Sequence, residues 1–565
     1  MLSRAFIVAI ILSCAIALGQ STASQRSDDP NPTPRQKGAI SGKVTRSTDG
    51  APLKKAVITL LPQQARGANF RAVSAITDAD GIFLLKDLEP GRYNLTASRT
   101  GFVRQMYGQR GPGNAGTALN LLEGQTLKDI NFRLVPGGAI SGRVVDEDSE
   151  PISGVRLQAL RWGYSNGRRQ LVPAGGFAQT DDRGEYRMFQ LAPGRYYLSA
   201  TYTGTGYMGG GVTTGFGTSD ASSEGYAPTY YPGVNDPAQA TALELRGGDD
   251  LPGINLRLVP VRAVRVSGRI VRSGTSRELA WVQLFSRRLS GFSSLHRGVD
   301  TDGKGNFEIS GVTPGSYFVV AEVEDGGKRL LARAAVEVDS SDVDGVILAL
   351  QPPAEIKGQI NLDGNFDSRP DHLRVMLSSE DPGPFSGGGS AAVQTDLNFV
   401  LNEVFDGDYV LRFFGLPPDA YVSAASMGKR DVLRDGVSVS GKADILSVVI
   451  SASGGRLDGS VLDEDNNPFR GARVVLVPEE TNWKRQELFK TANSDQNGQF
   501  TIRGIAPGKY KLFAWETIDE GAFYDPDFLR PILDDGKSVE VSPSSRAQVQ
   551  VKVIRSDASR SVGGG

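Results

Sequence analysis

The residues best suited to bind a ligand are aromatic side chains in polar, Gly-rich stretches. One stretch lies between residues 202 and 231, and another follows residue 514. Such rings can stack on the C–H faces of sugars while Asp, Asn or Arg side chains hold the hydroxyls. They serve equally as anchors in protein interfaces, or they pack over a domain end as a small extra core. The sequence leaves these three interpretations open; the candidate residues are Tyr202, Tyr207, Tyr226, Tyr230, Tyr231, Trp515 and Tyr524.

Residues for catalysis are scarce. The two histidines, His296 and His372, lie in different repeats and lack metal-ligand spacing, whereas a catalytic zinc site often uses two or three histidines. Two G-x-G-x-x-G sequences, at residues 111–116 and 204–209, are followed by loop-like sequence, although a dinucleotide site needs a helix there. We therefore predict that the protein is not an enzyme, with no catalytic residue, no cofactor and no metal ion.

A stretch of 19 residues recurs along the chain, and the structure that it forms must position any ligand-binding residues. Each full copy begins with [ST]-D-x-x-G and ends beyond a P-G-x-Y corner, with the turn glycine 12 residues before the tyrosine. A fifth, divergent copy keeps Phe399 and Tyr409 but has Asp406-Gly407 in place of Pro-Gly. The full copies span residues 77–95, 180–198, 301–319 and 494–512.

This stretch predicts a strand, a corner and a second strand. Asp and Gly at its start are turn residues, because Asp can cap its own backbone and Gly adopts positive φ. After the corner, Tyr93, Leu95 and Ala97 alternate with polar residues, which is the period of a half-buried strand. The turn aspartates leave calcium binding open as an alternative, although an EF-type loop needs about five oxygen positions.

A second motif precedes each copy and fixes the domain count. Glycines mark its five occurrences: Gly42, Gly142, Gly268, Gly358 and Gly459. Several short strands in about 100 residues indicate a two-sheet sandwich, and the repetition indicates five in tandem. The predicted ranges are a signal peptide (1–19), a flexible linker (20–37), sandwiches at 38–136, 137–260 with the long aromatic loop, 261–352, 353–452 (degenerate) and 453–556, and a disordered tail (557–565).

The first residues are typical of an export signal. Arg4 precedes an apolar run, residues 5–12, that is too short to span a bilayer, and cleavage is expected after Gly19. The only cysteine, Cys14, lies in this segment, where lipoprotein anchoring is the alternative. We predict a secreted, periplasmic or cell-surface protein with no transmembrane segment in the mature chain. The net charge of −2, without a basic cluster, argues against nucleic-acid binding.

Taken together, four motifs resemble the carboxypeptidase regulatory-like domain over nearly the whole mature chain. They are the G-x-V opening, the P-x-x-G-[VA]-x-[VL] strand, the T-D-x-x-G-x-[FY] turn and the P-G-x-Y corner. The resemblance implies a transthyretin-like (prealbumin-like) sandwich, close to collagen-adhesin B-type and starch-binding-like folds, with a structural or binding role. The expected fold is all-β, a tandem array of five antiparallel β-sandwich (transthyretin-like or Ig-like) domains. The expected function is non-catalytic polysaccharide binding or, alternatively, a cell-envelope scaffold or adhesion role with a protein partner.

Overall fold

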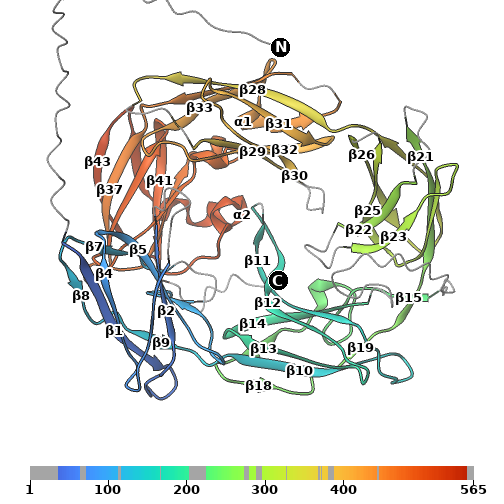
Figure 1. The fold of residues 1–565 in the computed structure, drawn as a ribbon, viewed down its shortest axis with the longest axis horizontal. Helices are drawn as coiled ribbons and strands as arrows, with labels where there is room; N and C mark the ends of the chain where they lie inside the picture. Colours follow the sequence, from blue (N-terminus) through green and yellow to red (C-terminus); the bar gives the residue numbers. More distant parts are fainter. Residues whose placement is uncertain are drawn as a thin grey trace, which may run out of the picture.

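The structure is a computed structural model in which two-sheet units follow one another around a ring (Figure 1). The five predicted ranges are called units 1 to 5, and their exact boundaries stay a prediction. The predicted signal peptide with Cys14, nearly all of the linker and the predicted tail lie outside the described residues. The structure describes residues 36–63, 72–111, 116–165, 167–202, 224–272, 279–287, 295–325, 328–366, 370, 372–379, 387–441 and 444–555.

All five units share one plan, which confirms the all-β sandwich prediction. In unit 5 one sheet has the strand order β40-β37-β43, and the other has the order β39-β38-β41-β42. Neighbouring strands are antiparallel, except that the first strand of each unit lies parallel to strands at the end of that unit. Each unit therefore brings the beginning and the end of its own segment together in one sheet.

The strands are short, as the alternating sequence predicts. Unit 1 contains β1 (Gly38–Arg46), β2 (Val57–Pro62), β3 (Val73–Ile76), β4 (Ile82–Leu88), β5 (Gly91–Ser98), β6 (Gln105–Met106), β7 (Leu119–Leu121), β8 (Thr126–Leu127) and β9 (Phe132–Leu134). Unit 2 contains β10 (Gly138–Val145), β11 (Arg156–Ser165), β12 (Arg168–Gln179), β13 (Glu185–Leu191), β14 (Gly194–Thr201), β15 (Glu224–Tyr226), β16 (Thr229–Tyr230), η1 (Pro237–Gln239), β17 (Leu243–Leu245), β18 (Asp250–Leu251) and β19 (Leu256–Arg257). Next, β20 (Pro260–Arg262) crosses the predicted boundary to unit 3 and pairs with β15.

Units 3 and 4 repeat this order. Unit 3 contains β21 (Val264–Arg272), β22 (Trp281–Ser286), β23 (Leu295–Asp300), β24 (Asn306–Val312), β25 (Gly315–Asp325), β26 (Lys328–Val338) and β27 (Val343–Leu350). Unit 4 contains β28 (Ala354–Asp363), β29 (Arg374–Ser379), β30 (Gly387–Ala392), β31 (Asn398–Val404), β32 (Gly407–Phe414), β33 (Tyr421–Met427), β34 (Arg430–Asp431), α1 (Val432–Asp435), β35 (Val437–Val439) and β36 (Leu446–Ser451).

Unit 5 adds short helices to the common plan. It contains β37 (Gly455–Leu462), β38 (Arg473–Pro478), η3 (Glu480–Asn482), η4 (Gln486–Leu488), β39 (Lys490–Asn493), β40 (Gln499–Ile505), β41 (Gly508–Trp515), η5 (Ala522–Tyr524), α2 (Pro526–Leu529), η6 (Arg530–Asp535), β42 (Lys537–Val541) and β43 (Arg546–Lys552). The segment 516–536, which holds η5, α2 and η6, connects β41 to β42 and reaches into the ring (Figure 1).

Each unit buries its own core between its two sheets. The pattern is visible in β4, where Phe83 and Leu85 are buried while Ile82 and Leu84 are exposed. Five large clusters of buried side chains follow one another along the chain, and each draws its members from a single predicted range. Burial of apolar surface in these separate cores is the main stabilising term for each unit.

The tyrosine of the repeated corner ties the corner together in every unit. Its hydroxyl donates to the carbonyl oxygen four residues earlier, at 2.6 to 2.8 Å: Tyr93 to Glu89, Tyr196 to Ala192, Tyr317 to Thr313, Tyr409 to Phe405 and Tyr510 to Ala506. Each ring is buried in the core of its unit. The P-G-x-Y spacing therefore serves both packing and hydrogen bonding.

The residue that opens the repeated turn bridges two strands through its hydroxyl. In unit 1, Thr77 Oγ1 donates to the Leu53 carbonyl at 2.6 Å and accepts from the Ala56 amide at 2.9 Å. Thr180 and Ser494 make the same pair of bonds in units 2 and 5. These hydroxyls are buried, so they satisfy backbone groups that water cannot reach.

The repeated opening glycine allows two backbones to approach. A Cβ on Gly42 would lie 2.1 Å from the Ile130 carbonyl oxygen, and a Cβ on Gly142 would lie 2.0 Å from that of Ile254. No side chain fits at these distances. The glycine is therefore required where the first strand of the unit meets the end of the unit.

Candidate functional site

The aromatic residues predicted in unit 2 fall into two groups on opposite sides of a sheet. Tyr202 and Tyr226 meet edge to face with ring centroids 5.7 Å apart, and both pack with Tyr231 against the main core of unit 2. Tyr230 is only 6% exposed and packs on the other face of the same sheet. Tyr207 lies outside the described residues.

The two aromatic residues predicted in unit 5 are Trp515, at the end of β41, and Tyr524, within the segment 516–536. Trp515 is 5% exposed and stacks on Phe513, with ring centroids 4.9 Å apart and planes 8° apart. Tyr524 is partly buried and meets Phe489 at a centroid distance of 5.0 Å. Together these rings form a second apolar cluster in unit 5, separate from the main core.

Strand β11 carries three large side chains on its outer face. Leu160, Trp162 and Tyr164 alternate with residues of the other face, as strand geometry requires. Leu160 and Trp162 pack with Tyr197 and Tyr230, and the rings of Trp162 and Tyr197 meet edge to face at 6.2 Å. This sequence of alternating apolar residues could have indicated the site, but the prediction did not include it.

The far end of β11 reaches unit 5 inside the ring (Figure 1). The Tyr164 ring meets the Phe528 ring of α2 at 6.2 Å, and Phe528 in turn meets Trp515 at 6.3 Å. A Cβ placed on Gly167 would lie 3.0 Å from the Tyr524 carbonyl oxygen. Three of the predicted residues, Tyr230, Trp515 and Tyr524, thus belong with unpredicted rings to two neighbouring aromatic clusters of units 2 and 5. They are called here the aromatic face: Trp162, Tyr164, Tyr197, Tyr230, Trp515, Tyr524 and Phe528.

Charged side chains border the aromatic face. The Arg169 guanidinium lies 5.2 Å from the centre of the Trp162 ring, within the range of a cation–π contact. Burial raises the pKa of Asp519, while the nearby Arg161 and Arg169 oppose that rise. Burial also raises the pKa of Tyr164, so its phenol is held neutral. The face therefore combines aromatic rings with arginine donors and a carboxyl group.

Three segments match the family model of the carboxypeptidase regulatory-like domain, at residues 39–135, 139–213 and 456–517. These segments lie in units 1, 2 and 5, which are therefore similar to carboxypeptidase regulatory-like domains. The family resemblance predicted from the sequence is therefore confirmed. The motif residues of these units position the turns and corners, and the aromatic face lies outside their main cores.

Several solved structures resemble the chain at low identity. The Bacillus anthracis TIE protein is 10% identical with a TM-score of 0.15, covering 76% of each chain. The minor pilin GBS52 of Streptococcus agalactiae is 13% identical with a TM-score of 0.22, covering 40% of this chain and 96% of its own. The major pilin subunit BcpA of Bacillus cereus is 10% identical with a TM-score of 0.14, covering 56% and 99% respectively. Among curated proteins, none matches the sequence.

A polar contact joins unit 1 to unit 5. Arg110 of unit 1 donates to Glu516 of unit 5 at 2.7 Å, and its guanidinium lies 4.2 Å from the centre of the Phe469 ring. Arg555 approaches the same carboxylate and the same ring, at 3.7 Å and 5.0 Å. Burial lowers the pKa of Arg110, whereas Glu516 raises it. This arrangement is called the closing contact.

A reciprocal pair of hydrogen bonds strengthens the closing contact. The Asn120 amide donates to the Gln496 side chain, and the Gln496 side chain donates back to the Asn120 carbonyl, both at 3.2 Å. Thr117 of unit 1 also lies against Gly471 of unit 5, where an added Cβ would meet the threonine hydroxyl at 2.6 Å. Units 1 and 5 therefore touch through backbone as well as side chains.

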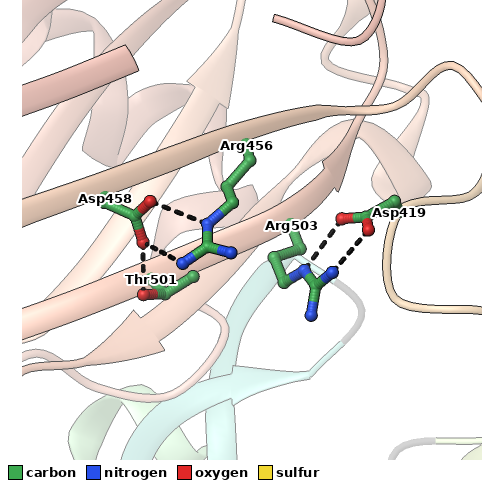
Figure 2. Close-up of polar contacts among 5 residues, drawn as sticks. All are labelled: Asp419, Arg456, Asp458, Thr501 and Arg503. Carbon is green, nitrogen blue, oxygen red and sulfur yellow. Dashed lines mark hydrogen bonds and ion pairs between the residues drawn. The ribbon is translucent and has the colours of Figure 1, made fainter. Parts of the chain in front are cut away.

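One arginine–carboxylate contact joins units 4 and 5, and a second lies beside it within unit 5 (Figure 2). Arg503 of unit 5 forms a two-bond fork with Asp419 of unit 4, with its Nε 2.8 Å from the carboxylate. Beside it, Arg456 binds Asp458 through two bonds of 2.7 and 2.9 Å, and Thr501 donates to the same carboxylate. These contacts lower the pKa of both aspartates, because the arginines favour the charged form.

The carboxylates of the repeated turns bind their own backbone. Asp78 Oδ1 accepts from the amides of Asp80 and Ile82 at 3.0 and 2.8 Å, and Asp495 makes the corresponding bonds in unit 5. Among the described residues, no group of three or more His, Cys, Asp or Glu side chains is placed to hold a metal ion. The G-x-S-x-G sequence at residues 163–167 connects two strands, whereas a nucleophile elbow connects a strand to a helix.

In the part of the chain that the structure describes, no helix is long and apolar enough to cross a bilayer.

Proposed function

We propose that the protein is a non-catalytic scaffold of the cell envelope, in which β-sandwich units are held in a closed ring and present their loops to other envelope molecules. The observation that carries this proposal is the closing contact. Arg110, Glu516 and Phe469 join units that lie at opposite ends of the described chain. We also propose that the protein is exported to the periplasm or the cell surface.

Closure matters because it fixes the positions of several weak binding surfaces relative to one another. Surfaces at fixed spacing bind a multivalent partner with a high effective concentration, provided that the geometry matches. Tyr230 and Trp515 are used to pack the units, so they shape the scaffold from within.

The closing contact can be tested by small-angle X-ray scattering of the full chain. Arg110→Glu places like charges beside Glu516, and we expect the radius of gyration to rise as the ring opens. The matched control is Arg530→Glu. Arg530 forms exposed ion pairs within unit 5, which also carries Glu516, but it takes no part in the closing contact. Equal scattering from wild type and Arg110→Glu would contradict the proposal.

A disulfide offers the opposite test. Cysteines introduced at positions 120 and 496 replace the pair that already exchanges two hydrogen bonds, and the only natural cysteine is Cys14. Oxidation should lock the ring without changing the scattering profile. A profile that becomes more compact on oxidation would show that the ring is usually open.

Polysaccharide binding is the second candidate, and the aromatic face favours it. Trp162 is only partly buried and lies beneath the Arg169 guanidinium, a combination of ring surface and donor that suits a sugar. Tyr202, Tyr226 and Tyr231 are also only partly buried and could extend such a site at the edge of unit 2. A neutral polymer with several rings would fit this surface better than a single small molecule.

Affinity gel electrophoresis through soluble polysaccharides separates the two candidates. Retardation by one polymer that disappears in Trp162→Ala, but persists in Trp281→Ala, would support glycan binding at the aromatic face. Trp281 is a suitable control because it is 42% exposed and belongs to unit 3. Unchanged mobility in every gel, with the ring intact, would favour a scaffold that binds a protein partner.

A further inference from the structure

Units 4 and 5 line a partly open polar cavity of about 290 Å³ that the scaffold role does not use. Its walls come from β33 of unit 4, from the turns η3 and η4 of unit 5, and from the corner at residues 506–510. Ligand sites favour interfaces between domains and usually measure roughly 300–1,000 Å³. A cavity at the lower end of that range suits one small ring-shaped molecule.

The floor of the cavity is rigid. Leu488 and Val422 are buried there, and the Tyr510 hydroxyl is held by the Ala506 carbonyl at 2.8 Å. Behind the wall, the indole nitrogen of Trp483 donates to the Pro478 carbonyl at 3.0 Å. The Arg503–Asp419 fork holds the two units against each other (Figure 2). A ligand would therefore enter a preformed site.

Hydrogen-bond donors and acceptors without a partner in the protein line the cavity. Within the described residues, the side chains of Glu479, Asn482 and Lys509 make no hydrogen bond or ion pair, and neither does the Tyr421 hydroxyl. Arg485 uses its Nε to bind Glu487 at 2.7 Å, which fixes the guanidinium and leaves its terminal nitrogens available. Glu479 and Lys509 are also exposed, so a ligand can reach them from solvent.

The geometry points to a binding site for an acidic sugar residue, a hexuronate ring, between units 4 and 5. Arg485 and Lys509 supply two cationic donors for the carboxylate, and guanidinium forks suit carboxylates in particular. Glu479 and Asn482 can accept from and donate to ring hydroxyls, while Tyr421 provides an aromatic wall. This site lies apart from the aromatic face and the closing contact, so the inference goes beyond the proposed scaffold function.

Saturation-transfer NMR of the full chain with sodium glucuronate tests the site, with glucose as the neutral probe. We expect transfer to glucuronate, at least tenfold weaker binding in Arg485→Gln and in Lys509→Ala, and no change in the control Lys357→Ala, which removes an exposed cation of unit 4 outside the cavity. Lys509 is exposed, so its replacement leaves folding intact even if Arg485→Gln does not. A thermal melt of each variant confirms that it is folded.

Three results would overturn the inference. They are absence of transfer to glucuronate, unchanged binding in both cavity variants, or equal binding of glucose and glucuronate. None of these outcomes depends on the radius of gyration, so failure of this site and failure of the closed scaffold are distinguishable.

Discussion

The same turn is built in two ways within this chain. Units 1, 2, 3 and 5 place a glycine with φ between 72° and 82° at its centre, whereas unit 4 places Leu397 there with φ of 67°. The hydrogen bonds are nevertheless the same, since Gly81 donates to Asp78 and Leu397 donates to Gln394 across the turn. Unit 4 also has Val393 where unit 1 has the bridging hydroxyl of Thr77, so it lacks that pair of buried bonds.

Unit 4 nevertheless keeps the residues that reach the core. Phe399 is 1% exposed, and the Tyr409 hydroxyl still binds the Phe405 carbonyl at 2.7 Å. This comparison indicates that the turn glycine and the bridging hydroxyl stabilise each unit locally and can be lost. Packing of the core side chains specifies the fold. The four predictions that follow test this division.

The largest effect is expected from Gly81→Ala in unit 1. The new Cβ would lie 2.4 Å from the Val44 carbonyl oxygen, and φ of 73° is unfavourable for alanine. Strain and overpacking together should cost about 3 kcal/mol. The measurement is amide hydrogen exchange in β1 and β4 of the full chain.

Gly305→Ala is the matched control for that change. At Gly305 the nearest atom to an added Cβ is 3.4 Å away, so only the backbone conformation is unfavourable and the cost should be about 1 kcal/mol. Equal destabilisation at the two glycines would show that close approach is unimportant.

Thr77→Val should come next, because it makes unit 1 resemble unit 4. Removing the hydroxyl leaves the Ala56 amide and the Leu53 carbonyl without this partner, at a cost of about 2 kcal/mol. Thr77→Ser keeps the hydroxyl, as Ser494 does in unit 5, and should cost about half as much. Amide exchange rates in β2 and β4 report the change in stability. Unchanged exchange in Thr77→Val would contradict a stabilising role for the Thr77 hydroxyl.

Tyr510→Phe tests the bond that all five units share. Loss of the hydrogen bond to Ala506 should cost about 1 kcal/mol at neutral pH. Burial raises the pKa of Tyr510 to about 12 from its ordinary value of 10.0. The folded state holds this proton more tightly, so the tyrosine's contribution is constant below pH 10 and is lost as the pH rises towards 12.

Differential scanning calorimetry between pH 8 and pH 11 measures that effect. The melting temperature of the wild type should fall more steeply above pH 10 than that of Tyr510→Phe. Parallel profiles would mean that Tyr510 titrates as it does in the unfolded chain.

The smallest effect is expected from Leu397→Gly. Relief of the left-handed conformation gains about 1 kcal/mol, and loss of partial packing against the unit 4 core costs a similar amount. Leu362→Gly is the control, because Leu362 packs on the same core from a strand and should lose about 2 kcal/mol. Amide hydrogen exchange in unit 4 measures the stability of both variants. Equal losses of stability in Leu397→Gly and Leu362→Gly would show that the backbone at Leu397 is not strained.

Much of the fold could be predicted from the sequence because its causes are local. Alternation along β4 and β5, turn aspartates and the P-G-x-Y corner each act within a few residues. The role of the Thr77 hydroxyl could not be predicted, since its partners lie 21 and 24 residues away. The parallel pairing within each unit is likewise set by tertiary packing.

The aromatic residues were found from composition, but their surroundings could not be. A Gly-rich neighbourhood around Tyr230 predicts an exposed loop, whereas the ring is covered by Leu160 and Tyr197 from other strands. The closing contact depends on pairs such as Arg110 and Glu516, which are separated by 406 residues. No local pattern marks such a pair, and only the assembled ring reveals it.

The parallel pairing of first and last strands determines how each unit would bear mechanical load. The chain enters at one end of this strand pair and leaves at the other, so a pull on the chain slides the two strands lengthwise and loads their hydrogen bonds in shear. The overlap covers seven residue pairs in unit 5 and six in units 3 and 4. In unit 2 the overlap is divided into two short stretches of two pairs each. Unit 2 is therefore expected to unfold first when an opened chain is stretched.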